Sequence, residues 1–433
     1  MRNNPQQILD EMPMGRLQVA AVFICVLLNA LDGFDILAIS FAAPGIAAEW
    51  GINRAALGVV LSMELIGMSI GSVFLGGFAD RFGRRPTILL CLGLMAAGMF
   101  LAARAGDVVT LSLIRLVTGL GIGGMLASTN AMVAEYSNAR RRDFCIAVMV
   151  AGYPLGVIIG GTFASMLLAY FDWRSVFLFG AVATAAMLPV VWFFLPESIA
   201  HLVHKRGPGA LEKINATLKR MGHGIIDALP ELVEEGPKSS WRDLFSPGLA
   251  RITLLLTLCY LTHIMTFYFI LKWVPKIVVD MGYAASAAGG VLVWASAGGA
   301  AGSYLFGWLT HYFRLRRLII FAMAGSVIVV NIFGQGQSGL TTLAIVACLV
   351  GIFTNSAIVG LYALFARLFP TNLRAGGTGF VIGVGRAGAA LGPIVAGILF
   401  ESGQGLAEVA FIMALGSLVA AILLTMLRDP DPS

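Results

Sequence analysis

Long apolar runs alternate with short polar stretches along almost the whole chain. The runs "ILLCLGLMAAGMFLAA" from Ile88 and "LIIFAMAGSVIVVNIF" from Leu318 contain no charged residue. A helix needs roughly 20 mostly apolar residues to cross a bilayer, and the runs approach or reach that length. Taking each apolar run between charged residues as one span predicts about twelve membrane-spanning helices, at residues 17–42, 54–77, 87–105, 108–135, 143–170, 174–195, 251–279, 284–309, 318–336, 340–368, 374–400 and 404–427.

One polar segment is much longer than the others and lies between the sixth and seventh spans. It predicts three parts: a six-helix half at 1–195, a central cytoplasmic loop at 196–250 and a second six-helix half at 251–433. Two internal repeats support this division. "LGGFADRFGRRPTILL" from Leu75 reappears in altered form as "FGWLTHYFRLRRLIIF" from Phe306, and "YPLGVIIGG" from Tyr153 matches "AALGPIVAG" from Ala389. Parallel six-span repeats with a binding site between them are one architecture of secondary transporters.

The composition excludes a soluble protein. Of 433 residues, 58% are hydrophobic and 12% are charged, whereas a soluble domain is about one-quarter charged. We therefore predict an all-α polytopic membrane protein with two pseudo-symmetric six-helix halves. The polar N-terminal residues, of mixed charge, are not typical of a cleavable signal peptide. No cysteine spacing suggests a disulfide framework or a metal site, so we expect buried free thiols, no metal and no cofactor, at Cys25, Cys91, Cys145, Cys259 and Cys348.

Arginines gather on one side of the predicted membrane. That side carries Arg2, Arg16, Arg81, Arg84, Arg85, Arg140, Arg141, Arg142, Arg314, Arg316, Arg317, Arg367, Arg374 and Arg428, and the other side carries Arg54, Arg104, Arg174 and Lys276. The positive-inside rule then predicts cytoplasmic termini and a cytoplasmic central loop. Topology accounts for the net charge of +6, so no nucleic-acid partner is expected.

The stretch "GGFADRFGRR" resembles the signature loop between the second and third helices of the major facilitator superfamily. The resemblance implies a conformational latch between the two halves, formed by Gly76, Asp80, Arg81, Gly83, Arg84 and Arg85. We expect Asp80 to cap a neighbouring helix N-terminus and to pair with nearby arginines. The second copy has His311 at the aspartate position and Trp308 at the second glycine, which argues against a symmetrical latch.

Other motifs resemble the aromatic acid:proton symporters of that superfamily. "DGFD" from Asp32 is similar to the family's first helix, "RLVTGLGIGG" from Arg115 with Glu135 to its fourth, and "GVGRAGAALGP" around Arg386 to its eleventh. The resemblance covers both halves and implies proton-coupled transport of an aromatic acid. Many members carry Pro-Asn in the fourth helix where this chain has Ala127-Ser128. Because that helix helps line the central cavity, the departure leaves open a substrate other than a typical hydroxybenzoate.

Asp32 and Asp35 are two carboxylates inside the first apolar run. At positions i and i+3 they share one helix face, so both can point into one cavity. A charge near the bilayer centre costs about 2.5–3.5 kcal/mol on insertion scales, and the cost falls when a carboxylate takes up a proton. Such a pair would supply proton coupling, and the sequence leaves open which residue carries the proton. The alternative is that Asp32 caps a helix broken at Gly33 while Asp35 forms a structural salt bridge.

Arg386 lies among glycines in the eleventh span. Its guanidinium suits a substrate carboxylate, or it forms a counter-ion to Asp32 or Asp35 in the empty state; a structural ion pair is the alternative. Arg115 either gates proton movement from the outer cavity or lies near the external interface. Glu135 suits a charge network with the signature loop better than direct binding, and for Glu64 the pattern does not decide which way it faces.

The seventh span, "CYLTHIMTFYFILKWVPKIV", carries rings and a histidine that could meet an aromatic substrate. The alternative is that Lys272 and Trp273 anchor the helix at the membrane interface and the other rings face lipid. The substrate-binding candidates are Arg386, His263, Tyr153, Tyr260, Phe267, Asn130 and Asn355, with Tyr268 and Tyr362 as further contacts.

These patterns together predict a proton-coupled symporter that imports a small organic acid, most plausibly an aromatic carboxylate, across a bacterial inner membrane. We expect a monomer to suffice. An exporter, a carrier of nonaromatic carboxylates and a transporter-like sensor remain alternatives. No P-loop and no nucleophile–base pair is present, so an ATP-driven pump and an enzyme lack support. The sequence does not identify the acid, the direction of transport, the proton stoichiometry or the oligomeric state.

Overall fold

The computed structural model describes residues 4–230, 241–336, 339–370 and 373–427, and in these ranges the chain forms helices and no strands. Arg2 and Arg428 lie outside the described residues. The first half consists of α1 (Pro5–Glu11), α2 (Arg16–Trp50), α3 (Arg54–Phe82), α4 (Arg84–Ala102), α5 (Val108–Tyr136), α6 (Arg142–Leu167) and α7 (Arg174–Phe194). Between the halves lie α8 (Ile199–Lys205), α9 (Ala210–Met221) and the 3₁₀ helix η1 (Trp241–Phe245). The second half consists of α10 (Ala250–Asp280), α11 (Ala285–Leu309), α12 (Leu315–Gly334), α13 (Leu340–Leu368), α14 (Arg374–Gly385), α15 (Ala387–Glu401) and α16 (Leu406–Thr425).

Within the described ranges, 11 helical stretches are long and apolar enough to cross a membrane, and α14 with α15 provides one of them. α11 is outside this set because glycine, serine, tryptophan and tyrosine lower its hydropathy. It nevertheless has 25 residues and no charged side chain, and it packs against the spanning helices α6 and α13. At 1.5 Å per residue it is roughly 37 Å long, enough to span. The predicted all-α polytopic fold with about twelve spans is confirmed.

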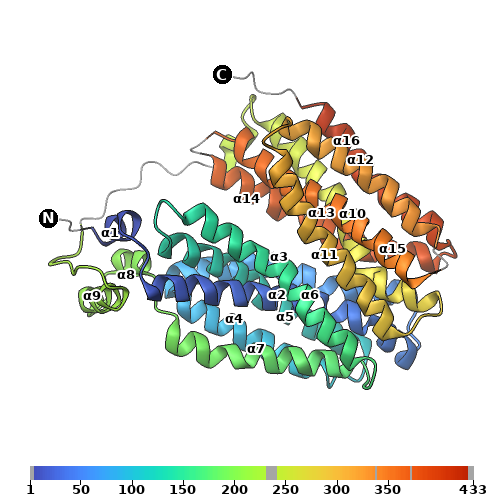
Figure 1. Cartoon of the computed structure of the whole chain (residues 1–433), viewed down its shortest axis with the longest axis horizontal. Helices are drawn as coiled ribbons and strands as arrows, with labels where there is room; N and C mark the ends of the chain where they lie inside the picture. Colours follow the sequence, from blue (N-terminus) through green and yellow to red (C-terminus); the bar gives the residue numbers. More distant parts are fainter. Residues whose placement is uncertain (1–3, 231–240, 337–338, 371–372, 428–433) are drawn as a thin grey trace.

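The two halves lie side by side (Figure 1). α1, α8 and α9 lie together at one end of the first half, at the left of the view. Hydrogen bonds hold part of this end together: the Ala139 amide donates to the Asp10 carbonyl, and the His223 ring lies 2.9 Å from the Gln18 side chain. The described arginines of the predicted cytoplasmic side lie at this end, and it is called the cytoplasmic end below after that prediction, with the opposite end called external.

The halves are packed tightly at the opposite, external end. A Cβ on Gly58 of α3 would lie 2.5 Å from the Pro393 carbonyl oxygen, and one on Gly397 of α15 would lie 2.5 Å from the Arg54 carbonyl oxygen. Arg54 also forms an ion pair of 3.2 Å with Asp280 of α10. Small residues allow such close approach of helices in membranes. These contacts hold α3 against α15 and α10 at this end, beside a hollow of about 460 Å³ on which Arg54 and Asp280 lie.

The cytoplasmic end contains a cleft between the halves. Ser72 of α3 lines it on one side, and the other side is α14 and its junction with α15, from Arg374 to Arg386. Its volume is about 620 Å³. This cleft therefore opens at the end that carries the described arginines of the predicted cytoplasmic side.

α2 is one continuous helix through Gly33 and Pro44, and it ends at Gly51 in a left-handed conformation with φ 58°. The interpretation that Asp32 caps a helix broken at Gly33 is therefore wrong. Gly33 has a packing role instead, since a Cβ there would lie 2.2 Å from the Tyr153 carbonyl oxygen of α6.

The signature loop turns at Gly83, whose φ of 112° favours glycine. Asp80 pairs with Arg84 at 2.6 Å, as predicted, but it does not cap α4. That role falls to Glu197, which follows α7 and accepts from the Arg84 amide at 2.8 Å. The side chain of Asp80 is exposed because it lies on the outer face of the last turn of α3.

The arginines of the loop contact their own half and the segment after it. Arg84 pairs with Glu135 at 3.4 Å, and Arg85 donates to the Trp192 carbonyl at the end of α7. Lys205 of α8 donates to the Arg81 carbonyl. Among the hydrogen bonds and ion pairs of these arginines in the described ranges, none reaches the second half, which fits an open cytoplasmic side.

Candidate functional site

A cluster of charged side chains is buried in the first half, toward its external end. Arg115 of α5 pairs with Glu64 of α3, and both side chains are 0% exposed. The same guanidinium donates to the Asp35 carbonyl oxygen of α2 at 2.8 Å and lies over the Phe177 ring at 5.4 Å. Charges removed from water persist only when they are paired and hydrogen-bonded. Arg115 therefore lies inside the bundle and not at the external interface.

Lys272 of α10 joins this cluster from the second half. Its ammonium lies 3.6 Å from Glu64 Oε2 and donates to the Ile36 carbonyl, and its side chain is fully buried. Trp273 is also buried and donates through Nε1 to the Pro393 carbonyl at 3.1 Å. The interpretation of Lys272 and Trp273 as an interface anchor is wrong, because both side chains are buried, Lys272 against the first half and Trp273 against α15 of its own half.

Asp32 and Asp35 lie near the middle of α2 and are buried, and none of their four carboxyl oxygens meets a donor in full hydrogen-bond geometry in the described structure, although the Thr184 hydroxyl of α7 interacts with Asp35. Asp35 faces α7, where its Oδ1 lies 3.3 Å from the position of a Cβ on Gly180. Neither residue lines a cavity found between the halves, so the expectation that both face one cavity is wrong in this conformation. Leu37 lies about 200° around the helix from Asp35 and lines a cavity between the halves.

Arg386 lies on the cytoplasmic cleft, at the junction of α14 and α15. The ring of Tyr260 from α10 packs against the neighbouring Gly385, where a Cβ would lie 2.4 Å from Cδ1. The hydroxyls of Tyr260 and Tyr362 are 2.9 Å apart. Arg386 forms no ion pair with Asp32, Asp35 or any other described carboxylate, so it is not their counter-ion in this conformation; Arg115 is the cation near Asp35.

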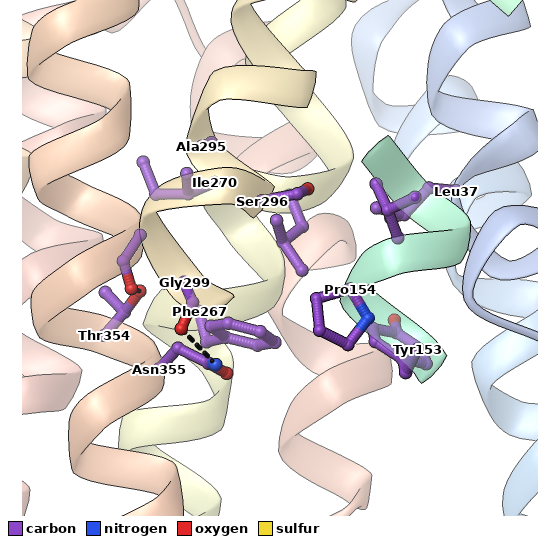
Figure 2. Close-up of a pocket in the computed structure, with 13 residues that line it drawn as sticks. Leu37, Tyr153, Pro154, Phe267, Ile270, Ala295, Ser296, Gly299, Thr354 and Asn355 are labelled. Atoms are coloured by element: carbon purple, nitrogen blue, oxygen red, sulfur yellow. Dashed lines mark hydrogen bonds between the residues drawn. The ribbon is translucent and has the colours of Figure 1, made fainter. Parts of the chain in front are cut away.

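A second, smaller cavity lies between the halves (Figure 2). Leu37, Tyr153 and Pro154 from the first half face Phe267 and Asn355 from the second. The Tyr153 hydroxyl is buried without a partner, and the Asn355 amide donates to the Gly299 carbonyl at 2.9 Å. The cavity volume is about 50 Å³. Drug-sized ligands occupy pockets of roughly 300–1,000 Å³, so this cavity is too small for an organic acid, whereas the cleft beside Arg386 has room for one.

His263 lies away from both cavities. Its Nδ1 is 2.9 Å from Ser417 Oγ and its Nε2 is 2.9 Å from the Thr354 carbonyl oxygen. The ring is fully buried and cross-links α10 to α13 and α16. The expectation that His263 binds substrate is wrong for this conformation, because both ring nitrogens already have partners.

Two positions on α5 lie outside the cavities as well. The Asn130 amide donates to the Leu126 carbonyl one turn earlier in its own helix. Ala127 packs near Gly76 of α3, and the Ser128 hydroxyl donates to the Gly124 carbonyl. The expectation that the Ala127-Ser128 departure lines the central cavity is therefore wrong here, since these side chains meet α3 or their own helix.

Glu135 lies at the cytoplasmic end of α5, paired with Arg84 and accepting from the Ser198 hydroxyl. Within the described ranges, no group of three or more His, Cys, Asp or Glu side chains could hold a metal ion.

The sequence analysis assigned Lys272 to the membrane interface and not to a buried site, and it did not decide which way Glu64 faces. The available signal was their depth: Lys272 lies eight residues, about 12 Å, inside the external end of α10, and Glu64 about 15 Å inside that of α3. An ionisable residue at such a depth is a functional candidate by default. The sequence does not identify the partner of such a residue, because the partner lies on another helix.

Comparisons with known proteins agree with this architecture. The family model described as "Major Facilitator Superfamily" matches residues 23–334 and 256–433. The 4-hydroxybenzoate transporter PcaK of Acinetobacter baylyi is 32% identical over 430 residues, covering 96% of this chain and 92% of that protein. The gallate transporter of Pseudomonas putida is 30% identical over 419 residues, with the same coverage of each chain.

Among solved structures, the xylose transporter XylE from E. coli in an inward open conformation has a similar fold. The TM-score is 0.74 at 15% sequence identity, covering 94% of this chain and 96% of that one. These relatives and this structural neighbour are transporters, so this multi-pass membrane protein is a transporter and not an enzyme. The chain belongs to the major facilitator superfamily and, within it, to the family of aromatic acid transporters.

Proposed function

We propose that this protein is a proton-coupled symporter that imports a small aromatic carboxylate by alternating access. One arrangement carries the proposal: a cation on the cleft between the halves, Arg386, lies opposite a half that buries two carboxyl groups without hydrogen-bond partners, Asp32 and Asp35. The guanidinium of Arg386 can pair with the carboxylate of the substrate, and the carboxyl groups of Asp32 and Asp35 can take up the proton.

The carboxyl pair supports coupling for a physical reason. An ionised carboxylate in an apolar interior costs far more free energy than a neutral one, unless it is paired and hydrogen-bonded. Asp32 and Asp35 have no such bonds here, so a bound proton lowers their cost while they are shielded from water. In any state of the transport cycle in which water reaches these groups, the ionised form is hydrated and the proton passes to that water. A proton affinity that differs between states is what coupling requires.

The substrate class is supported by relatives and by the cleft. Gallate and 4-hydroxybenzoate, named in the relatives' descriptions, are hydroxylated benzoate anions. The guanidinium of Arg386 presents a fork of donors that matches a carboxylate, and Tyr260 and Tyr362 beside it suit an aromatic ring or a ring hydroxyl. When the halves close on the substrate, Tyr153 and Phe267 are placed to meet its other end.

The setting follows from the same features. We place the protein in a bacterial inner membrane with both termini cytoplasmic, because arginines concentrate at that end. Residues 1–195 and 251–433 act as the two moving halves joined by residues 196–250, and one copy of the chain contains the whole site. The glycine contacts between α3 and α15 form the external seal that must part when the site faces outward.

Uptake of labelled acids by cells expressing the chain tests the proposal. The panel holds benzoate, hydroxybenzoates, gallate, gentisate, vanillate, phenylpropionates and the nonaromatic muconate, each with and without a protonophore. We expect accumulation of at least one aromatic acid, abolished by the protonophore. Accumulation of muconate alone contradicts the substrate class, and protonophore-insensitive accumulation contradicts the coupling. No accumulation by a correctly inserted protein contradicts import.

A further inference from the structure

Lys272 belongs to the second half by sequence, yet its polar contacts lie in the first half. Its ammonium donates to the Ile36 carbonyl of α2 and pairs with Glu64 of α3. The side chain is fully buried, so water does not replace these partners in this conformation. A buried ammonium keeps its charge only while it is paired. The contact therefore exists only while the two halves are together at this depth.

Glu64 connects this contact to the rest of the cluster. One of its carboxyl oxygens meets Arg115, and the other meets Lys272. Arg115 in turn donates to the backbone carbonyl of Asp35. A continuous series of contacts thus runs from α10 of the second half, through α3 and α5, to the helix that carries the carboxyl pair.

The contact lies next to the external seal. Trp273, the next residue, donates to the Pro393 carbonyl of α15, and Ser62, two residues from Glu64, donates to the Ala390 carbonyl of the same helix at 2.7 Å. When α3 separates from α15 to open the external side, Glu64 and Lys272 move with opposite halves. Opening must therefore break the Lys272–Glu64 pair.

We infer that Lys272 locks the external side closed by inserting the cation of one half into the buried charge cluster of the other. It is a positioning residue for the transport cycle and is distinct from the substrate cation Arg386. This inference deepens the proposed alternating-access transport, but its test uses neither substrate nor proton gradient. If the uptake panel fails, cysteine labelling still tests the lock. If the labelling test fails, the uptake panel still tests the proposed function.

The test measures external opening through a single cysteine. Ser62 is fully buried between α3 and α15, so Ser62→Cys reacts with a membrane-impermeant maleimide from outside only when these helices part. The half-buried Cys348 is first replaced by serine, and the other four cysteines are buried. Lys272→Met is placed in this background. The matched control is Lys276→Met, one turn farther along α10, where the lysine is partly exposed and pairs within its own helix.

The lock predicts a rise of about tenfold or more in the labelling rate of Ser62→Cys in Lys272→Met, which corresponds to a loss of about 1.4 kcal/mol from the closed state. Lys276→Met and Lys272→Arg should stay within about twofold of the parent. Glu64→Gln should raise labelling at least as much as Lys272→Met, since it also removes the ion pair with Arg115, and adding Lys272→Met to it should change labelling little, because the Lys272–Glu64 pair is already lost. Equal labelling of Lys272→Met and Lys276→Met would overturn the inference.

Removing a buried charge also carries a risk of misfolding, which membrane insertion and gel filtration in detergent detect. If Lys272→Met fails these checks, Glu64→Gln and Lys272→Arg decide. Faster labelling in Glu64→Gln with parental labelling in Lys272→Arg supports the lock. Parental labelling in Glu64→Gln overturns it.

Discussion

The interiors of the two halves differ although their helices repeat. The first half buries Asp32, Asp35, Glu64 and Arg115, and these side chains are either paired helix to helix or left without partners. In the second half, a histidine with both ring nitrogens hydrogen-bonded takes a structural role, and the cation Arg386 lies on the cleft. Under the proposed function, this difference corresponds to a division of labour, in which the first half would carry the proton and the second half would bind the substrate's carboxylate.

The signature loop and its repeat show the same asymmetry at the cytoplasmic end. Arg85 donates to a carbonyl in the last turn of α7, and Arg316 donates to the Leu424 and Thr425 carbonyls at the end of α16. Both arginines thus cap the sixth spanning helix of their half. At the position of Asp80 the repeat has His311, which is exposed and bonds to its own helix. The arginine contact with the sixth spanning helix is thus present in both halves, whereas the aspartate is present in one.

The largest effect is expected from the carboxyl pair. Asp32→Asn and Asp35→Asn should each reduce the steady-state accumulation ratio of the transported acid to about one, because a neutral amide cannot load and release a proton. Exchange of labelled for unlabelled substrate should persist, since exchange needs no net proton movement. Counterflow and accumulation assays in vesicles measure the two separately.

The control for these variants is Asp107→Asn. Asp107 is the N-cap of α5 and accepts from the Thr110 amide at 2.9 Å, and Thr110 hydrogen bonds hold the pKa of this carboxyl below its ordinary value. Asparagine caps helices equally well, so transport should be unchanged. Normal accumulation by both Asp32→Asn and Asp35→Asn would show that neither carboxyl group carries the proton, and it would contradict the role assigned to the first half.

The next largest effect is expected at Arg386. Arg386→Ala should raise the KM for uptake by a factor on the order of 100, because truncating one partner of a desolvated charge pair costs about 2–5 kcal/mol. Arg386→Lys should recover part of the affinity, since it keeps the charge and loses the fork. Arg374→Ala, at the exposed start of α14 on the same cleft, is the control and should leave KM nearly unchanged. If Arg374→Ala matched Arg386→Ala, only the general charge of the cleft would matter.

His263 should affect stability more than transport. His263→Phe leaves the Ser417 hydroxyl and the Thr354 carbonyl in a buried site without the ring nitrogens, at a cost of about 1–3 kcal/mol. We expect a lower thermal midpoint in detergent and an unchanged KM. Unchanged stability with lost uptake would instead make His263 part of the substrate path. The contrast between the two halves would then no longer include a purely structural role for His263.

The smallest effect is expected at the repeat of the signature loop. His311→Asp restores the missing carboxylate on an exposed turn, where surface substitutions usually stay within about 0.5 kcal/mol. Uptake should remain within about twofold of the parent, whereas Asp80→Asn, which removes one of the two carboxylate partners of Arg84, should lower it further. Loss of activity on adding the carboxylate at 311 would show that the asymmetry of the two loops is itself required.

The fold was largely predictable because hydrophobic run length and arginine placement are one-dimensional signals. The spans, the repeat and the depth of Asp32, Asp35 and Arg386 all follow from them. What the sequence did not reveal is rotation about each helix axis. Asp35 and Leu37 are two residues apart yet face different neighbours, and Lys272 was assigned to the membrane interface because its partner Glu64 lies 208 positions earlier in the chain. Such pairings depend on how helices from both halves pack together.

The most direct test of the division of labour follows protons and substrate together in weakly buffered vesicles. Adding the transported acid outside should make the external medium alkaline in the wild-type protein, because each anion would enter with a proton. Asp35→Asn should carry substrate in exchange without this alkalinisation, and Arg386→Ala should show alkalinisation only at much higher substrate concentration. Substrate entry without proton movement in the wild type, or full alkalinisation in Asp35→Asn, would contradict the account.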